Sequence, residues 1–503
     1  MVRPIRISII AISVILVLFT MQIGVSAKKK SSKRKTRSAR SVPVIFMAPV
    51  QRNVPVVVTL PVLSPAVATD TLVNMAASTQ RATSSSSTST TVSGSGIGSS
   101  GGDNDGKRPW SVLPSKPAAG SLIISEFRVR GPNGANDEFV EIYNDSGADH
   151  TVASISGTGY AVAASDGIVR CSLPNGTVIP ARGHFLCANS VGYSLASYPS
   201  GNGTTATGDS TYTTDIPDNA GIALFNNNTG GGSFSLANRF DAVGSTSEAN
   251  TLYKEGTGYP ALTPFSIDYA FVRDECGKSG SITTLGTCPI STPKDTDNNA
   301  TDFIFVDTNG TSAGAGQRLG APGPQNLSSP IQRNSTITEN LLDATVTRSS
   351  PPNRVRDFTS DPANNSTFGT LSIRRRFVNS TGAAVTRLRF RVIDLTTFPA
   401  PSGIADLRPR TSSAVVVAGI NDTVTCAATG APATPPCTAT VQGTTLEQPP
   451  SQPNGGGFNS TLSAGTVTLG TPLANGASIN VQFLVGIQQT GNFRIYVNME
   501  ALP

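Results

Sequence analysis

Charged side chains are scarce in this sequence. Asp, Glu, Lys and Arg make up 14% of the 503 residues, against about 25% in ordinary soluble domains. The scarcity excludes a helical bundle or a coiled coil, which are built from long stretches of Ala, Glu, Lys, Leu and Arg. Histidine is rarer still, because only His150 and His184 occur. Neither has an evident Ser, Cys or metal-ligand partner in the sequence.

What the chain has instead is Gly (49 residues), Pro (35) and short alternating apolar runs. Runs such as EFVEIYN at 138–144 alternate polar and apolar side chains, as half-buried strands do. Gly, Pro and Asn separate these runs and favour turns. The sequence therefore predicts an all-β protein. Further strands are expected at 160–164, 168–171, 184–188, 221–225, 239–243, 266–273 and 303–307.

The formal net charge of +6 is unevenly distributed. Residues 1–40 carry ten basic and no acidic side chains, whereas 120–330 carry ten basic and twenty acidic ones, a net charge of −10. Residues 331–503 carry thirteen Arg, no Lys and nine acids, a net charge of +4. A nucleic-acid footprint needs a basic folded face or an adjoining arm. Nucleic acid is therefore an unlikely partner for the folded body, although the basic arm 28–40 leaves a surface nucleic-acid-binding alternative open.

The N-terminus resembles an export signal in its order of features. Arg3 and Arg6 precede an apolar run, and Val25-Ser26-Ala27 offers a small-residue cleavage site. Residues 28–40 (KKKSSKRKTRSAR) then carry eight basic side chains, and positive charge there opposes translocation. The alternative is an uncleaved membrane anchor. The basic stretch could contact anionic lipid or an acidic wall polymer.

Six cysteines lie in three local pairs and favour the export reading. An even number of closely spaced pairs is typical of disulfides in an oxidising compartment. No C-x-x-C occurs, so zinc and redox sites lack their usual ligand spacing. We therefore expect a secreted or cell-surface protein, membrane-anchored if the signal is uncleaved. The expected disulfides are Cys171–Cys187, Cys276–Cys288 and Cys426–Cys437.

The chain after the signal divides into a linker and two folded regions. Residues 28–117 are basic, then rich in Pro and Val, then in Ser, Thr and Gly, and this composition predicts a disordered linker. Folded sequence follows over 118–326 and 331–503. The second region predicts two hairpins, one pairing 371–379 with 383–395 and one pairing 477–487 with 492–502. Residues 445–458 predict a long mobile loop.

The opening LIISEFRVRGPNGANDEFVEIYN resembles that of a bacterial lamin-tail domain. Similar stretches recur at 179–199, 215–226, 239–245 and 295–326, so the resemblance covers about residues 118–326. It implies an immunoglobulin-like β-sandwich of secreted or surface proteins, without catalytic residues to carry over. The second region resembles no family in particular, and we expect a second sandwich of immunoglobulin-like or related type.

An acid-rich loop within the first region is a candidate calcium site. Calcium prefers carboxylate, amide and carbonyl oxygens, which alternate along Asp295, Asp297, Asn299 and Asp302. The sixth-position Gly and terminal Glu of an EF-hand are missing, and a turn capped by its own side chains is the alternative. No other cofactor is expected.

Alternating arginines in the second region are a candidate binding face. Arg387, Arg389 and Arg391 share one face of a strand, and we expect Arg374 and Arg376 to face them across the hairpin. Guanidinium groups so arranged suit an acidic polysaccharide, a phosphate or an acidic protein surface, including the acidic first region. A solvated sheet face is the structural alternative.

These observations predict a non-catalytic binding or structural protein that attaches to an envelope polysaccharide or a surface protein. The first alternative is an extracellular hydrolase or hydrolase accessory module, which would draw its acid and base from Glu126, Glu138 and Glu141. Glu138 and Glu141 are three residues apart, so a regular strand points them to opposite faces. A glycosidase pair would need a bulge or a third carboxylate.

Overall fold

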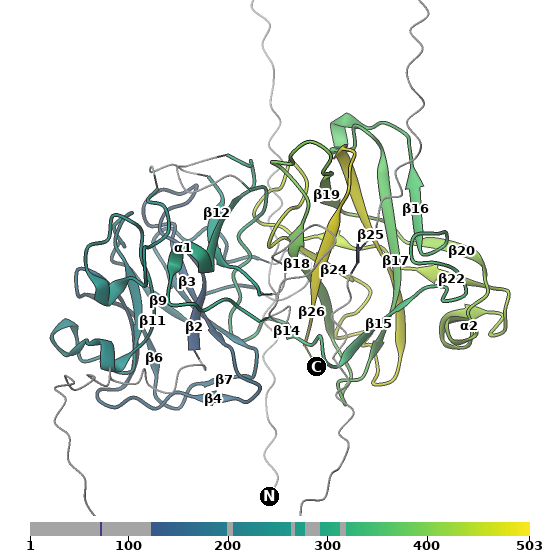
Figure 1. Ribbon diagram of the computed structural model, residues 1–503. Helices are drawn as coiled ribbons and strands as arrows, with labels where there is room; N and C mark the ends of the chain where they lie inside the picture. The colour runs from purple at the N-terminus through teal and green to yellow at the C-terminus, as the bar shows by residue number, and fades with distance from the viewer. Residues whose placement is uncertain are drawn as a thin grey trace, which may run out of the picture. The chain divides into compact units, whose positions relative to one another are not determined.

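The computed structural model describes residues 71–72, 122–198, 205–262, 267–276, 292–311 and 318–502. The chain divides into two units, Met1–Pro65 and Ala66–Pro503, and every described residue belongs to the second. The predicted signal, the basic stretch 28–40 and nearly all of the linker lie outside the described residues. Within those residues, no helix is long and apolar enough to cross a membrane. The predicted all-β class is confirmed (Figure 1).

The first β unit, residues 122–326, contains two larger sheets and a two-stranded ribbon. Its six-stranded sheet has the order β13 (Phe303–Asp307), β12 (Tyr269–Arg273), β2 (Leu122–Arg128), β3 (Phe139–Asn144), β8 (His184–Asn189) and β9 (Ser210–Tyr212). Its four-stranded sheet has the order β11 (Arg239–Val243), β10 (Ile222–Phe225), β5 (Gly159–Ala164) and β6 (Val169–Pro174). The ribbon and the short helices are β4 (His150–Thr151), β7 (Val178–Ile179), η1 (Gly231–Ser233), η2 (Leu236–Asn238), η3 (Thr251–Tyr253) and α1 (Asn299–Asp302).

Strand alternation gives the six-stranded sheet two buried faces. On β3, Val140 and Ile142 join the core shared with the four-stranded sheet, as Val162 and Leu224 do from the other side. Phe139 belongs to a different cluster, on the opposite face of the sheet. Successive strand residues point to opposite faces. Glu141 therefore lies on the face that does not meet the four-stranded sheet.

The second β unit, residues 331–502, is built from three sheets. The largest has the order β1 (Thr71–Leu72), β26 (Arg494–Leu502), β18 (Arg387–Leu395), β24 (Thr461–Ser463) and β23 (Thr445–Leu446), with β14 (Ile331–Gln332) also on β26. The next has the order β15 (Ile337–Leu341), β17 (Thr370–Asn379), β25 (Ser478–Gln489) and β19 (Asp406–Arg410), with β16 (Arg354–Asp357) also on β17. The smallest sheet and the helices are β20 (Val415–Ile420), β22 (Cys437–Val441), β21 (Gly430–Ala431), α2 (Thr423–Thr429) and η4 (Pro362–Asn364).

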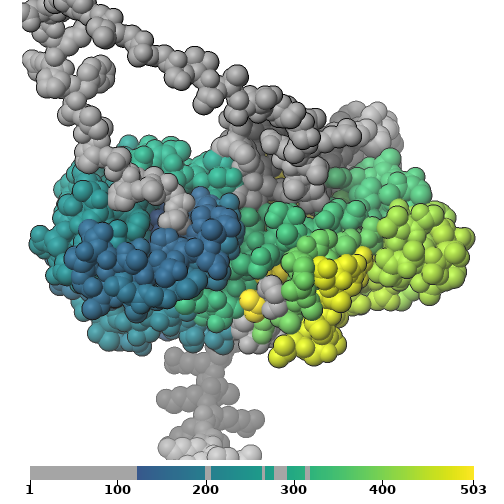
Figure 2. Space-filling view, turned by 90° about the horizontal axis from the view of Figure 1, so that it is seen from below, coloured from purple at the N-terminus to yellow at the C-terminus, as the bar shows by residue number. Residues whose placement is uncertain are grey.

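Both hairpins predicted for this unit are wrong. β17 pairs with β25, side by side in Figure 1, whereas β18 pairs with β26. Each expected hairpin therefore joins strands of two different sheets, so that its connection crosses the apolar core between them. That core contains Ile373 and Phe483 from one sheet and Phe390 and Ile495 from the other. Yellow residues from the C-terminal part of the chain lie at the surface beside green ones of the same unit (Figure 2).

The predicted mobile loop 445–458 is also wrong. Glu447 and Phe458 are buried, and Phe458 packs into a cluster of the first β unit. The backbone N–H of Phe458 donates to the Leu319 carbonyl at 2.9 Å, and the Ala321 N–H donates to the Phe458 carbonyl at 3.0 Å. The segment is packed between the two units. Its Pro and Gly residues therefore allow two backbones to approach each other closely.

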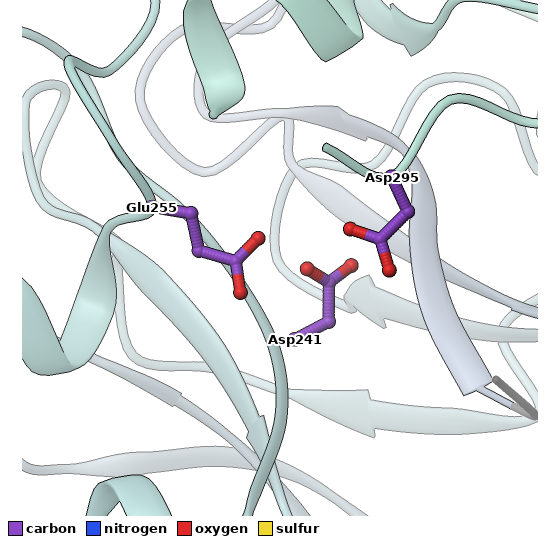
Figure 3. A group of neighbouring side chains, drawn as sticks. All are labelled: Asp241, Glu255 and Asp295. Carbon is purple, nitrogen blue, oxygen red and sulfur yellow. The ribbon is translucent and has the colours of Figure 1, made fainter. Parts of the chain in front are cut away.

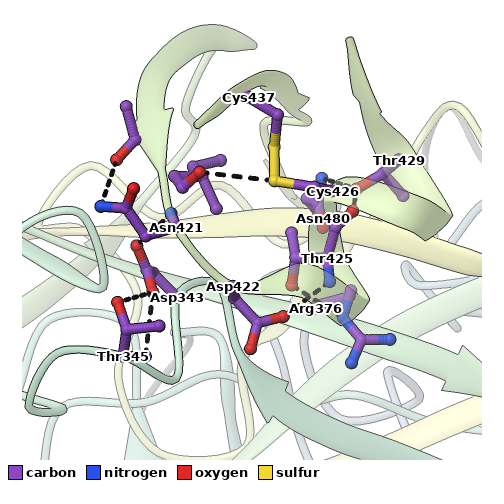
Figure 4. The surroundings of a disulfide bond; sticks show 12 residues. Asp343, Thr345, Arg376, Asn421, Asp422, Thr425, Cys426, Thr429, Cys437 and Asn480 are labelled. Carbon is purple, nitrogen blue, oxygen red and sulfur yellow. Dashed lines mark hydrogen bonds between the residues drawn. A yellow bond between two sulfur atoms is a disulfide. The ribbon is translucent and has the colours of Figure 1, made fainter. Parts of the chain in front are cut away.

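Two of the three expected disulfides are present, Cys171–Cys187 and Cys426–Cys437. Cys288, half of the third pair, lies outside the described residues. The Cys426–Cys437 bond ties α2 to β22 beside β25 (Figure 4). Disulfides of this kind are typical of an oxidising, extracellular environment.

Candidate functional site

A buried polar layer joins the two β units, and we call it the seam. One side of it is the face of the six-stranded sheet that points away from the four-stranded sheet. The other side is the face of β18 and β26 that points away from the core of the second unit. Asn459 donates from Nδ2 to Glu126 Oε2 at 3.0 Å, and Tyr198 Oη hydrogen-bonds Thr461 Oγ1. The charged and polar side chains at its centre are Glu126, Glu141, His184, Arg389, Arg391, Glu447, Asn459 and Glu500, all buried.

The basic half of the seam is organised around Glu500. Arg389 Nε donates to Glu500 Oε2 at 2.5 Å and Arg391 Nε to Oε1 at 2.7 Å, so one carboxylate serves two cations. Glu447 Oε2 lies 3.6 Å from Arg389 Nη1. Burial raises the pKa of Glu500, but the two guanidinium groups outweigh burial and hold that pKa below its ordinary value. Glu500 is therefore ionised throughout the physiological range.

The acidic half places Glu126 and Glu141 opposite each other on β2 and β3. A register shift between Ile124 and Glu126 turns the Glu126 side chain to the same face as Glu141. Glu126 accepts from the Gly323 N–H at 2.8 Å, and Glu141 accepts from the Gln325 N–H at 2.6 Å. Burial, and then the neighbouring Glu126 charge, raise the pKa of Glu141 to about 8. Burial also raises the pKa of Glu126, although Arg391 opposes it.

His184, on β8, lies beside Glu141. Its Nε2 lies 3.7 Å from Glu141 Oε1, and its Nδ1 has no hydrogen-bond partner among the described residues. Burial lowers the pKa of His184 to about 3. The imidazole is therefore neutral at physiological pH, and Glu141 is the neighbouring group whose raised pKa favours the protonated form.

A cavity of about 80 Å³ lies in the seam. Glu126, Glu141, His184, Arg391 and Glu500 all line it. A protonated Glu141 could donate a proton there, which is the chemistry of a general acid. Sites for organic ligands occupy about 300–1,000 Å³, whereas this cavity has room for a few water molecules. The carboxylates also have oxygens that accept hydrogen bonds from backbone N–H groups.

Two of the four predicted calcium ligands accept hydrogen bonds from backbone N–H groups. Asp302 accepts from the Thr296 N–H at 2.9 Å, and Asn299 Oδ1 accepts from the Gly244 N–H at 3.0 Å. Asp297 has the positive φ of 54° found in turns. The side chain of Asn299 thus bonds distant backbone groups, and that of Asp302 bonds the loop before α1. Calcium binding by Asp295, Asp297, Asn299 and Asp302 stays a prediction.

Asp295 instead comes close to two acids that the sequence did not connect with it. Its carboxylate and those of Asp241 and Glu255 lie within 4.8 Å of one another (Figure 3). Arg273 shares this position: its Nη2 lies 2.6 Å from Asp241 Oδ2 and its Nη1 3.5 Å from Asp295 Oδ1. Arg273, together with Arg239 at 3.0 Å from Glu255, thus offsets part of the negative charge of the group.

The five predicted ligand-binding arginines do not share one face. Arg374 and Arg376 lie on β17, and Arg387, Arg389 and Arg391 lie on β18 of the other sheet. Arg376 Nε donates to Thr425 Oγ1 of α2 at 3.1 Å (Figure 4). Arg389 and Arg391 are buried against the acidic unit, one of the partners considered from the sequence. Ligand binding by the set stays a prediction.

Sequence reasoning missed Glu447, Asn459 and Glu500. The available signal was the alternation of Glu500 with Met499 and Ala501, which places a carboxylate opposite an arginine strand. It could be used only if β18 and β26 were known to pair. No protein-family model, curated protein or solved structure matches this chain.

Proposed function

We propose that this is an exported, non-catalytic cell-surface or extracellular protein whose two β units bind an envelope polysaccharide or a surface protein. The observation that carries the proposal is the seam. Its buried carboxylates and guanidinium groups join the two β units, and the disulfides suit an oxidising environment. Two joined β units on an N-terminal linker are suited to presenting a binding surface.

Three finer features belong to the same proposal. The first unit is an immunoglobulin-like sandwich of lamin-tail type, which the lamin-tail resemblance and the apolar core between its two larger sheets support. The second is a sandwich of related type, with the core between β17–β25 and β18–β26 in support. Residues 1–27 direct export.

Retention on envelope material tests this function. The purified mature protein is incubated with cell-envelope polysaccharide and, separately, with envelope protein, and bound protein and released saccharide are both measured. We expect retention without release of product. Retention that is lost when the protein is unfolded by reduction of its disulfides supports binding by the folded units. Absence of retention on both materials contradicts the proposal.

A second candidate is a hydrolase that uses Glu141 as a general acid. It is favoured by the pKa of about 8 and by the adjoining Glu126 and His184. Product release from polysaccharide that disappears in Glu141→Gln, but persists in Glu138→Gln, would establish it. Glu138 is a matched control because burial likewise raises its pKa to about 8, while it does not line the seam cavity.

A further inference from the structure

The edge strand β20 of the smallest sheet is open on one side. The sheet has the order β20, β22, β21, and β20 pairs antiparallel with β22 (Figure 1). Apart from that pairing, nothing within the described part of the chain hydrogen-bonds the backbone of residues 415–418. Part of the N–H and C=O groups of an edge strand point away from its neighbour. Those of β20 are therefore available to a further strand.

The strand also lacks the residues that protect other sheet edges. Natural sheets block an open edge with charged side chains or proline. β20 reads Val-Val-Val-Ala-Gly-Ile and has neither. The other described edge strands of four or more residues each have at least one: β6 (Arg170, Pro174), β11 (Arg239, Asp241), β13 (Asp307), β15 (Glu339), β16 (Arg354, Arg356, Asp357) and β19 (Asp406, Arg408, Pro409, Arg410). The edge of β20 is therefore suited to pairing.

The two faces of β20 differ in what they contact. Val417 belongs to a buried apolar cluster with Leu342, and Val415 packs against that cluster. Val416 points to the opposite face, since successive strand residues alternate, and its side chain is 73% exposed. A register shift between Val417 and Ile420 ends the regular part of the strand. The part that is open to pairing is thus centred on Val416.

This part of the strand is complementary to a second copy of itself. When two copies pair antiparallel about a twofold axis at Val416, each Val416 lies opposite its copy on the exposed face. Val415 then lies opposite Val417 on the face of the buried cluster. All of these opposed pairs are β-branched and uncharged, which is favourable across antiparallel strands. A slip by one residue would instead set an exposed face against a buried one.

The flanking charges favour the same antiparallel arrangement. Arg410 lies six residues before Val416 and Asp422 six residues after it, with no charged residue between them. Antiparallel pairing brings the basic end of one copy toward the acidic end of the other, whereas parallel pairing brings like charges together. Both groups keep their present partners, Asp361 for Arg410 and the Thr425 N–H for Asp422. The charges therefore set the orientation rather than the strength of the pairing.

We propose that this protein forms a twofold-symmetric dimer, in which β20 pairs antiparallel with β20 of a second copy. The two three-stranded sheets then become one continuous sheet. Each copy uses the same edge, so the assembly closes at two copies. A dimer also carries the proposed binding surface twice, which strengthens attachment to a repetitive polymer. The dimer itself does not depend on the ligand proposed above.

Sedimentation velocity of the mature full-length protein, over a range of concentrations, tests the dimer. We expect monomer and dimer in an equilibrium that shifts toward dimer as the concentration rises. Val416→Lys sets two like charges opposite each other at the twofold axis, and it should raise the dimer dissociation constant at least about tenfold. Leu469→Lys is the matched control, because Leu469 is 84% exposed in the loop after β24, and it should associate as the wild type does.

Two results would overturn the proposal: a wild type that stays monomeric at every concentration, or a Val416→Lys variant that associates as strongly as the wild type. Assemblies larger than a dimer would also contradict it, because a closed pair leaves no β20 edge for a third copy.

A mixture of two variants tests the register. Val416→Glu alone should stay monomeric, as Val416→Lys does. An equimolar mixture of the two should form dimers, because opposite charges then meet at the axis. Recovery in the mixture also shows that both variants are folded. A mixture that stays monomeric contradicts a pairing centred on Val416.

Discussion

Replacing Glu500 by Gln should destabilise the protein more than any substitution at an exposed ion pair. Both oxygens of the carboxylate accept guanidinium N–H groups, at 2.5 and 2.7 Å, and all three side chains are at most 9% exposed. The amide keeps the shape but leaves two buried cations, of which Arg389 retains only Glu447 at 3.6 Å. Breaking a buried pair by removing one partner costs about 3–5 kcal/mol. We expect the free energy of unfolding to fall by an amount in that range.

Urea unfolding followed by circular dichroism measures this change, with Asp361→Asn as the matched control. Asp361 lies 3.8 Å from Arg410, and the two side chains are 41% and 22% exposed. Exposed pairs contribute about 0–1 kcal/mol, so this variant should unfold close to the wild type. If Glu500→Gln and Asp361→Asn unfolded at the same urea concentration, the seam would not hold the units together as argued here.

Three further predictions concern the seam and the disulfides. Because folded Glu141 keeps its proton up to a pKa of about 8 while the unfolded chain ionises near 4.5, stability should fall as the pH rises between these values, and Glu141→Gln should flatten that slope in urea titrations. Asn459→Ala removes hydrogen bonds to Glu126 and Arg391 at a residue with φ of 61°; its thermal midpoint should drop well below that of Asn365→Ala, which has φ of 56° but a half-buried side chain with one hydrogen bond, to the Pro453 carbonyl. Serine at both Cys426 and Cys437 should cost about 2–4 kcal/mol, as expected for opening a short loop, and an unchanged unfolding free energy would contradict a structural role for that bond.

Strand positions could be predicted from the sequence, but their partners could not. The alternation in 371–379 and 383–395 identifies two strands and their apolar faces. The alternation does not distinguish a hairpin within one sheet from a connection between two sheets. In both cases the same face of each strand is buried. The composition of 445–458 predicts a mobile loop, since Pro and Gly weaken regular structure whether or not a second unit packs against them.

The candidate site was out of reach for the same reason. Glu126 and Glu141 come together through an irregularity in β2, whereas the sequence indicated a bulge or a third carboxylate only for a pair of Glu138 and Glu141. Glu500, the carboxylate of the basic half of the seam, lies far away in the chain. The position of Glu500 between Arg389 and Arg391 follows only from the residue-by-residue pairing of β26 with β18.

Export of the folded β units is the premise on which their proposed binding role depends. The mass of the native protein, isolated from fractionated cells and measured with and without reduction and alkylation, tests that premise most directly. We predict a chain that begins at Lys28, is found outside the cytoplasm, and takes up alkyl groups on its cysteines only after reduction. An intact N-terminus with six cysteines that alkylate without reduction would contradict both export and the disulfide-stabilised fold.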